Sequence, residues 1–151
     1  MALMRALDQD KDEIMTVTRH AIGLCCLGLA SAVLAGPRDT LLDGYAAAAK
    51  SADPAFSGFS AARGEQLFRT EHAGGKPDTP ACTSCHGKDE RAAGRTRSGK
   101  PIDPMAVSAT PGRYQDRAKV EKWFKRNCDE VLGRECSTRE KGDWLAYMIS
   151  R

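Results

Sequence analysis

The stretch Cys82-Thr83-Ser84-Cys85-His86 decides how the rest of this chain is interpreted. Two cysteines separated by two residues can each form a thioether to one vinyl group of a haem, and the histidine that follows then lies under the iron. The motif therefore predicts one covalently bound haem c, attached at Cys82 and Cys85, with His86 as an axial iron ligand.

Two rival chemistries for a C-x-x-C pair lack their usual partners in this sequence. A structural zinc site would need a second pair of closely spaced ligands, but Cys128 and Cys136 are eight residues apart. A thioredoxin-like dithiol belongs to a βαβ setting, and no strand pattern accompanies the motif. Haem attachment remains the interpretation that the residues support best.

Composition fits one modest domain and excludes one class of partner. The chain has 151 residues, of which 41% are hydrophobic and only 6% aromatic, so a haem would add apolar volume that the core lacks. The formal charge of +3 is small, and no row of aromatic residues accompanies the scattered basic residues. We therefore expect no nucleic-acid partner.

Four helical segments are predicted, and no strand pattern competes with them, so the expected fold class is all-α. The segments are residues 39–51, 60–72 and 116–132, and a last helix that the capping box Ser137-Thr138-Arg139-Glu140 opens. A long irregular segment, residues 87–113, separates the second helix from the third. Loops of this length in a compact domain usually wrap around a ligand or perform a function.

The sequence around the haem motif resembles that of class I cytochromes c. In that family an N-terminal helix with a glycine and an aromatic residue crosses a C-terminal helix that bears aromatic residues. Gly64 and Phe68 match the first helix, and Trp144-Leu145-Ala146-Tyr147 match the second. The resemblance implies a class I cytochrome c fold, in which helices and long loops wrap around one covalent haem.

The first 35 residues differ from the rest. Arg19 and His20 precede an apolar run from residue 21 to 35, which is too short to span a bilayer comfortably and ends in a small-residue cleavage site, Val33-Leu34-Ala35. We predict that residues 1–35 are a cleaved signal peptide and residues 36–151 a single periplasmic cytochrome c domain that is not embedded in the membrane. A retained membrane anchor is the alternative.

The second axial ligand of the iron determines the function, and the residues alone leave it open. Met105 lies in the long loop, as the methionine ligand of an electron carrier would, but only 19 residues after His86. Met148 is at helical spacing on the last helix and is expected in the core. His72 is expected at the surface. Asn127 interrupts an apolar stripe of the third helix, where a buried amide bonded to backbone groups is the alternative to a ligand. The other expected members of this stripe are Val120, Trp123, Phe124 and Val131.

A closer resemblance favours the asparagine. The run from Val120 to Asp129, followed by Gly133-Arg134-Glu135-Cys136, resembles the sphaeroides haem protein family, oxygen-binding variants of the class I fold. In that family an asparagine is the sixth ligand of ferric haem, and an adjacent cysteine forms a disulfide. The similarity covers most of residues 38–151. It implies that Asn127 is the ligand and that Cys128 and Cys136 are bridged.

An amide oxygen is a hard, weak donor that suits Fe(III) better than the softer Fe(II). We therefore expect an exported monohaem cytochrome from which Asn127 leaves on reduction, so that O2, NO or CO binds. A plain electron carrier with Met105 or Met148 on the iron is one alternative. A small haem enzyme that oxidises NO is another, although no histidine, arginine and carboxylate constellation marks acid–base catalysis.

Each hypothesis requires an electron donor. The family resemblance suggests a dihaem cytochrome c or a membrane cytochrome b. Lys88 and Lys100 are candidates for guiding an acidic partner, with ordinary surface charges as the alternative. Arg126, beside Asn127, either assists a distal ligand or lies on the helix surface.

Overall fold

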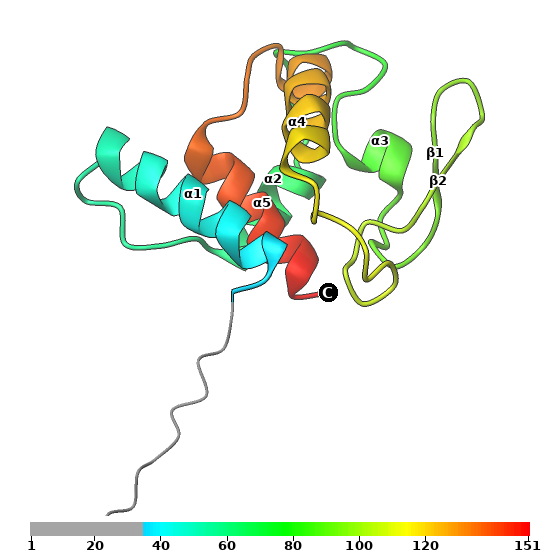
Figure 1. The fold of residues 1–151 in the computed structure, drawn as a ribbon. Helices are drawn as coiled ribbons and strands as arrows, with labels where there is room; N and C mark the ends of the chain where they lie inside the picture. The colour runs from blue at the N-terminus through cyan, green and yellow to red at the C-terminus, as the bar shows by residue number, and fades with distance from the viewer. Residues whose placement is uncertain (1–34) are drawn as a thin grey trace, which may run out of the picture. The chain divides into compact units, whose positions relative to one another are not determined.

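The structure is a computed structural model that describes residues 35–151. The predicted signal peptide lies almost wholly outside these residues. The described elements run α1 (Pro37–Ala52), α2 (Ala61–Arg69), α3 (Thr83–His86), β1 (Gly94–Arg95), β2 (Pro101–Ile102), α4 (Arg117–Leu132) and α5 (Thr138–Ile149) (Figure 1). None of these helices is long and apolar enough to cross a membrane.

Helices α1 and α2 pack against α5, and this is the core of the domain. A Cβ atom at Gly64 of α2 would collide with the Asp143 carbonyl of α5, so only glycine allows the two backbones to approach this closely. Phe68, one turn later, is fully buried, and its ring lies 6.0 Å from that of Tyr147. The predicted crossing of an N-terminal and a C-terminal helix is therefore confirmed.

The helix boundaries follow the capping residues. The Ser60 side chain accepts a hydrogen bond from the Arg63 N–H, and Ser137 and Glu140 form the predicted capping box. Gly133 ends α4 in the left-handed conformation, with φ of 68°. Helix α2 ends at Arg69, three residues before the predicted end, because the chain turns there and the His72 N–H donates to the Pro80 carbonyl.

Helix α4 begins directly after its N-cap, Asp116, which is the first residue of the predicted range. It buries four residues that recur at helical spacing: Val120, Phe124, Cys128 and Val131. Phe124 makes edge-to-face contacts with Tyr45 of α1 and Trp144 of α5. The expectation that Trp123 belongs to the buried stripe is wrong, since its side chain is 44% exposed. Trp123 lies about 100° around the helix from Phe124, at the edge of the stripe.

The long segment 87–113 is not entirely irregular. Strands β1 and β2 form a short antiparallel ladder in which Gly94 pairs with Ile102. Each strand has only two residues, so no alternating sequence pattern could predict it. The fold class is still helical. Beyond β2 the chain returns to the core, where Met105 is buried and its backbone N–H donates to the Glu90 carbonyl over 2.8 Å.

Candidate functional site

The predicted attachment motif forms α3, a single helical turn. The backbone N–H groups of Cys85 and His86 both donate to the Cys82 carbonyl, over 3.3 and 3.1 Å. Gly94 of β1 packs directly on this turn, because a Cβ there would collide with the Cys85 carbonyl. The turn therefore holds two free thiols and one imidazole close together, on a backbone supported by the hairpin.

Neither thiol has the properties of a redox-active dithiol. Burial raises the pKa of Cys82 to about 11, and burial also raises the pKa of Cys85. Reactive dithiols instead have a lowered pKa, which supplies the thiolate at neutral pH. Residues 35–151 also contain no cluster of three or more histidine, cysteine or acidic side chains arranged to hold a metal ion. The raised pKa values therefore do not favour a redox-active dithiol.

The His86 imidazole is neutral at physiological pH. Burial, and next the positive charge of Arg113, lower its pKa to about 4, which leaves a nitrogen lone pair free for a metal. Its Nδ1 atom is buried and has no hydrogen-bond partner among the described residues. The Phe68 ring lies 6.4 Å away, centroid to centroid. His86 is thus half-buried beside Phe68, with its Nδ1 atom free of hydrogen bonds from the described residues.

The side of α4 that carries Asn127 also carries Glu130. Glu130, one turn further along α4, is close enough to Cys85 for its negative charge to raise the pKa of that thiol. Residues three apart on a helix are surface neighbours, so the half-buried Asn127 shares this side with Glu130. The exposed Trp123 lies one turn before Asn127, also next to this side.

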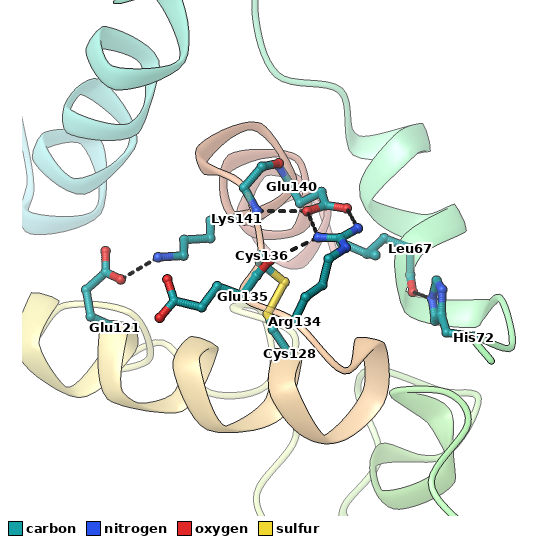
Figure 2. Close-up of a disulfide and its surroundings, with 10 residues drawn as sticks. Leu67, His72, Glu121, Cys128, Arg134, Glu135, Cys136, Glu140 and Lys141 are labelled. Atoms are coloured by element: carbon teal, nitrogen blue, oxygen red, sulfur yellow. Dashed lines mark hydrogen bonds and ion pairs between the residues drawn. A yellow bond between two sulfur atoms is a disulfide. The ribbon is translucent and has the colours of Figure 1, made fainter. Parts of the chain in front are cut away.

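The other candidate ligands occupy different environments. Met148 is completely buried on α5, as predicted, and Met105 is also part of the hydrophobic core. His72, expected at the surface, is half-buried, and its Nε2 atom lies 3.1 Å from the Leu67 carbonyl oxygen (Figure 2). All three side chains therefore already have protein neighbours that account for their positions.

The end of α4 is linked, near Asn127, to the loop that leads into α5. A disulfide joins Cys128 and Cys136, whose Cα atoms are 5.6 Å apart, so the predicted bridge is present in the structure (Figure 2). About two turns earlier on α4, the Glu121 carboxylate accepts a 2.8 Å hydrogen bond from Lys141 of α5. Two ties along one helix restrict both its rotation and its sliding, which fixes the position of Asn127.

A third contact holds α4 against the loop that leads to the attachment motif. The sequence analysis did not predict this contact. The Lys76 N–H donates to the Glu130 carbonyl over 2.8 Å. Cβ atoms at Gly74 and Gly75 would collide with the backbone of the last turn of α4. The Gly74-Gly75 pair was the available signal, since paired glycines often mark a close backbone approach.

These residues fit a covalent haem c. Two free thiols lie one helical turn apart beside a neutral imidazole with an unpaired ring nitrogen. On α4, the half-buried Asn127 amide shares one side of the helix with Trp123, whose side chain is 44% exposed.

Comparison with known proteins agrees with this site. Residues 54–148 match the model of a family described as a domain of unknown function, DUF1924. The chain is 52% identical to the cytochrome c-type protein SHP of Cereibacter sphaeroides over 128 aligned residues. This alignment covers 80% of this chain and 95% of SHP. The chain belongs to the SHP family of c-type cytochromes. A C-x-x-C motif in a c-type cytochrome implies covalent haem c.

Two solved structures of cytochromes c match the fold of this chain. The structure of oxidised SHP, an oxygen-binding cytochrome c, matches with a TM-score of 0.70 and 49% identity, covering 77% of this chain and 97% of that one. Cytochrome c'' of Methylophilus methylotrophus is 32% identical over 107 residues, covering 70% of this chain and 74% of that protein. Its oxidised crystal structure matches with a TM-score of 0.67. The predicted class I cytochrome c fold is confirmed.

Proposed function

We propose that this cytochrome holds one haem c through Cys82, Cys85 and His86, and that the Asn127 amide is the sixth ligand in the oxidised protein. On reduction Asn127 leaves, and the reduced protein takes up dioxygen or a related diatomic molecule such as NO or CO. The protein would then act as a ligand-binding cytochrome, with electrons supplied by a partner such as a dihaem cytochrome c or a membrane cytochrome b.

The chemistry of the side chains supports this sequence of events. A haem c supplies an iron that cycles between a harder ferric and a softer ferrous state. An amide oxygen is a hard and neutral donor, so its preference for the ferric state is strong and its hold on the ferrous state weak. Neutral His86 remains a good ligand in both states because burial keeps the imidazole unprotonated.

The position of Asn127 is the observation that carries the proposal. This amide shares one side of α4 with Glu130, whose charge acts on Cys85 of the attachment motif. The two candidate methionines are instead part of the hydrophobic core. The relatives are consistent with this choice: SHP is an oxygen-binding cytochrome c, and the solution structure of cytochrome c'' addresses haem-ligand detachment in that protein.

Optical spectra of the purified holoprotein test the proposal, taken oxidised, then reduced with dithionite, then with carbon monoxide. We expect high-spin ferrous haem that binds carbon monoxide at once. Asn127→Ala should leave the ferric haem open or water-ligated and change its spectrum, because the ligand oxygen is removed. The matched controls Met105→Leu and Met148→Leu keep side-chain volume and should leave the ferric spectrum unchanged.

Two results would contradict the assignment. A sharp low-spin ferrous spectrum that is indifferent to carbon monoxide would indicate a ligand that stays bound in both oxidation states. If a methionine variant changed the ferric spectrum and Asn127→Ala left it unchanged, the protein would be an electron carrier with a sulfur ligand.

We also propose that the protein is exported and processed after Ala35. The disulfide between Cys128 and Cys136 supports this, since such bonds persist mainly in oxidising compartments such as the periplasm. Mass spectrometry of the haem protein purified from cells tests it. A mature chain that begins at Gly36 is expected, whereas a protein that retains residues 1–35 in the membrane fraction would support the anchor instead.

A further inference from the structure

The solvent-exposed side of α4 has an unusual charge balance. Opposite its buried stripe, its exposed charged residues comprise four cations and one anion: Lys119, Lys122, Lys125 and Arg126 against Asp129. None of the four cations forms an ion pair with another residue of the described chain. We call these five residues the basic face of α4. Over residues 36–151, by contrast, 20 basic residues face 16 acidic ones.

The other acidic residues of α4 do not neutralise the basic face, because they are turned towards the protein. Glu121 is ion-paired with Lys141 of α5 over 2.8 Å, and Glu130 with Lys76 of the preceding loop over 3.5 Å. Both carboxylates are half-buried. The helix thus uses its acids to hold its own position and presents its bases to solvent, which creates a local positive potential.

The surface beside the basic face is hollowed in two places. One open depression of about 430 Å³ is lined by Lys122, Lys125, Arg126, Asp129 and Glu135. A second, of about 230 Å³, shares Lys122, Lys125 and Glu135 and reaches Cys136 and Lys141. A binding partner would therefore contact two depressions and charges of both signs. This combination favours a protein as the partner. Asp129 and Glu135 would repel a uniformly anionic lipid surface.

The basic face also borders the proposed haem site. The Arg126 guanidinium lies over the Trp123 ring, 5.6 Å from its centroid, and Trp123 lies one turn from Asn127. A donor bound here would lie next to the proposed ligand Asn127. The geometry points to the basic face of α4 as the docking surface for a protein electron donor that presents an acidic patch. This inference rests on the proposed function, because it names the partner surface of that same site.

Reduction of the ferric holoprotein by a small acidic flavoprotein, reduced flavodoxin, provides the test. The second-order rate constant is measured by stopped flow at several ionic strengths for the wild type and for two double variants. Lys122→Glu with Lys125→Glu alters the basic face, whereas Lys88→Glu with Lys100→Glu alters two exposed lysines elsewhere and changes the net charge equally. We expect the first variant to lose at least tenfold in rate at low salt, a difference that disappears at high salt. The second should lose much less.

Binding is also measured without electron transfer. In NMR titrations of the holoprotein with oxidised flavodoxin, amide shifts should concentrate in residues 119–129. Equal rate losses in the two double variants, or shifts centred on Lys88 and Lys100, would overturn the inference. So would binding of the wild type to phosphatidylglycerol vesicles that the Lys122 and Lys125 variant lacks, since the basic face would then be a lipid surface.

Carbon monoxide binding separates this inference from the proposed function. Both double variants should keep the wild-type ferric spectrum and bind carbon monoxide when reduced, because neither alters a proposed haem ligand. Intact carbon monoxide binding with equal flavodoxin rates would refute the docking surface alone. A ferrous wild type that binds no carbon monoxide would refute the proposed function while the rate comparison still located the docking surface.

Discussion

Among single residues, Glu140 shows how one side chain can make the stability of this domain depend on pH. Its carboxylate receives two hydrogen bonds from Arg134, of 2.7 and 2.8 Å, and a third from the Ser137 N–H of the capping box. The Arg134 hydrogen bonds are the largest cause that lowers the pKa of Glu140 to about 2, from an ordinary 4.5. A depressed folded-state pKa stabilises the fold above the ordinary pKa and ceases to do so as the pH falls.

We therefore expect Glu140→Gln to be less stable than the wild type by about 1 kcal/mol at neutral pH, because the carboxylate caps the start of α5. The difference should shrink as the pH falls from about 5 towards about 2, through the range in which the wild-type carboxylate gains a proton. Denaturant unfolding of both holoproteins at a series of pH values measures this. A difference that stays constant over that range would show that the charge of Glu140 contributes nothing.

Single residues also show what could be predicted from the sequence. Cys82, Cys85 and His86 were identifiable because their chemistry requires short spacing, and they lie on one helical turn. Trp123 was misplaced because periodicity predicts a stripe but not its edge, and the width of the stripe depends on what packs against it. Arg113, which acts on His86 through its charge, is far away in sequence and carries no local signal.

At the scale of elements, the disulfide between α4 and the loop that leads into α5 should contribute much of the local stability. The cysteines are eight positions apart, and the chain-entropy model assigns such a short loop about 2.5 kcal/mol. Replacing Cys128 and Cys136 together by serine should lower the free energy of unfolding by about that amount. Chemical denaturation of the ferric holoprotein measures it.

The hydrogen bond from Lys141 of α5 to Glu121 of α4 serves as the comparison. Lys141→Met removes the hydrogen bond to Glu121 but keeps the aliphatic packing, and it should cost about 1 kcal/mol or less because the carboxylate is partly solvated. If the lysine variant lost more stability than the double serine variant, the disulfide would not be the main connection between α4 and the start of α5.

The contact between the Gly74-Gly75 loop and α4 allows a separate prediction. In Gly75→Ala the added methyl group would collide with the Glu130 carbonyl and the Val131 backbone, so the end of α4 must move. We expect a loss of about 1–3 kcal/mol in stability. The ferric spectrum should also change towards that of Asn127→Ala, because Asn127 lies in the adjacent turn.

Gly112→Ala is the matched control, because no atom lies within 4 Å of its added Cβ. Its spectrum and stability should remain close to those of the wild type. A Gly75→Ala protein with an unchanged ferric spectrum would show that the loop does not position Asn127, even if stability fell.

Helices of ordinary length were predictable here, whereas the smallest elements were not. Helices α1, α4 and α5 have apolar periodicity over three or more turns together with capping residues, and these two signals agree. Helix α3 has four residues and each strand two, so no periodic pattern can develop. These elements form because the backbone of the haem motif packs against Gly94, which is a tertiary cause.

At the scale of the whole molecule, Glu90 joins segments that are distant in sequence. Its carboxylate, whose side chain is only 5% exposed, accepts a 2.6 Å hydrogen bond from Arg69 at the end of α2 and another from the Tyr147 hydroxyl of α5. Its backbone carbonyl accepts from the N–H groups of Met105 and Ala106. One buried residue therefore connects two core helices with the returning loop. Its partners lie 21 and 57 residues away, so no local pattern could have indicated them.

Glu90→Gln removes the charge of this connection while nearly keeping its shape. Hydrogen bonds to a charged group contribute more than neutral ones, and the Arg69 guanidinium would lose its buried counter-ion, so we expect a loss of about 2 kcal/mol in unfolding free energy. Asp89→Asn is the control, because exposed Asp89 accepts one hydrogen bond, from the Arg91 N–H, which an asparagine oxygen preserves. Denaturant unfolding of the holoproteins, followed by circular dichroism, compares the two. Equal stability of the two variants would mean that the charge of Glu90 does not stabilise the contact of α2, α5 and the Met105 loop. Apolar packing would then hold these segments together.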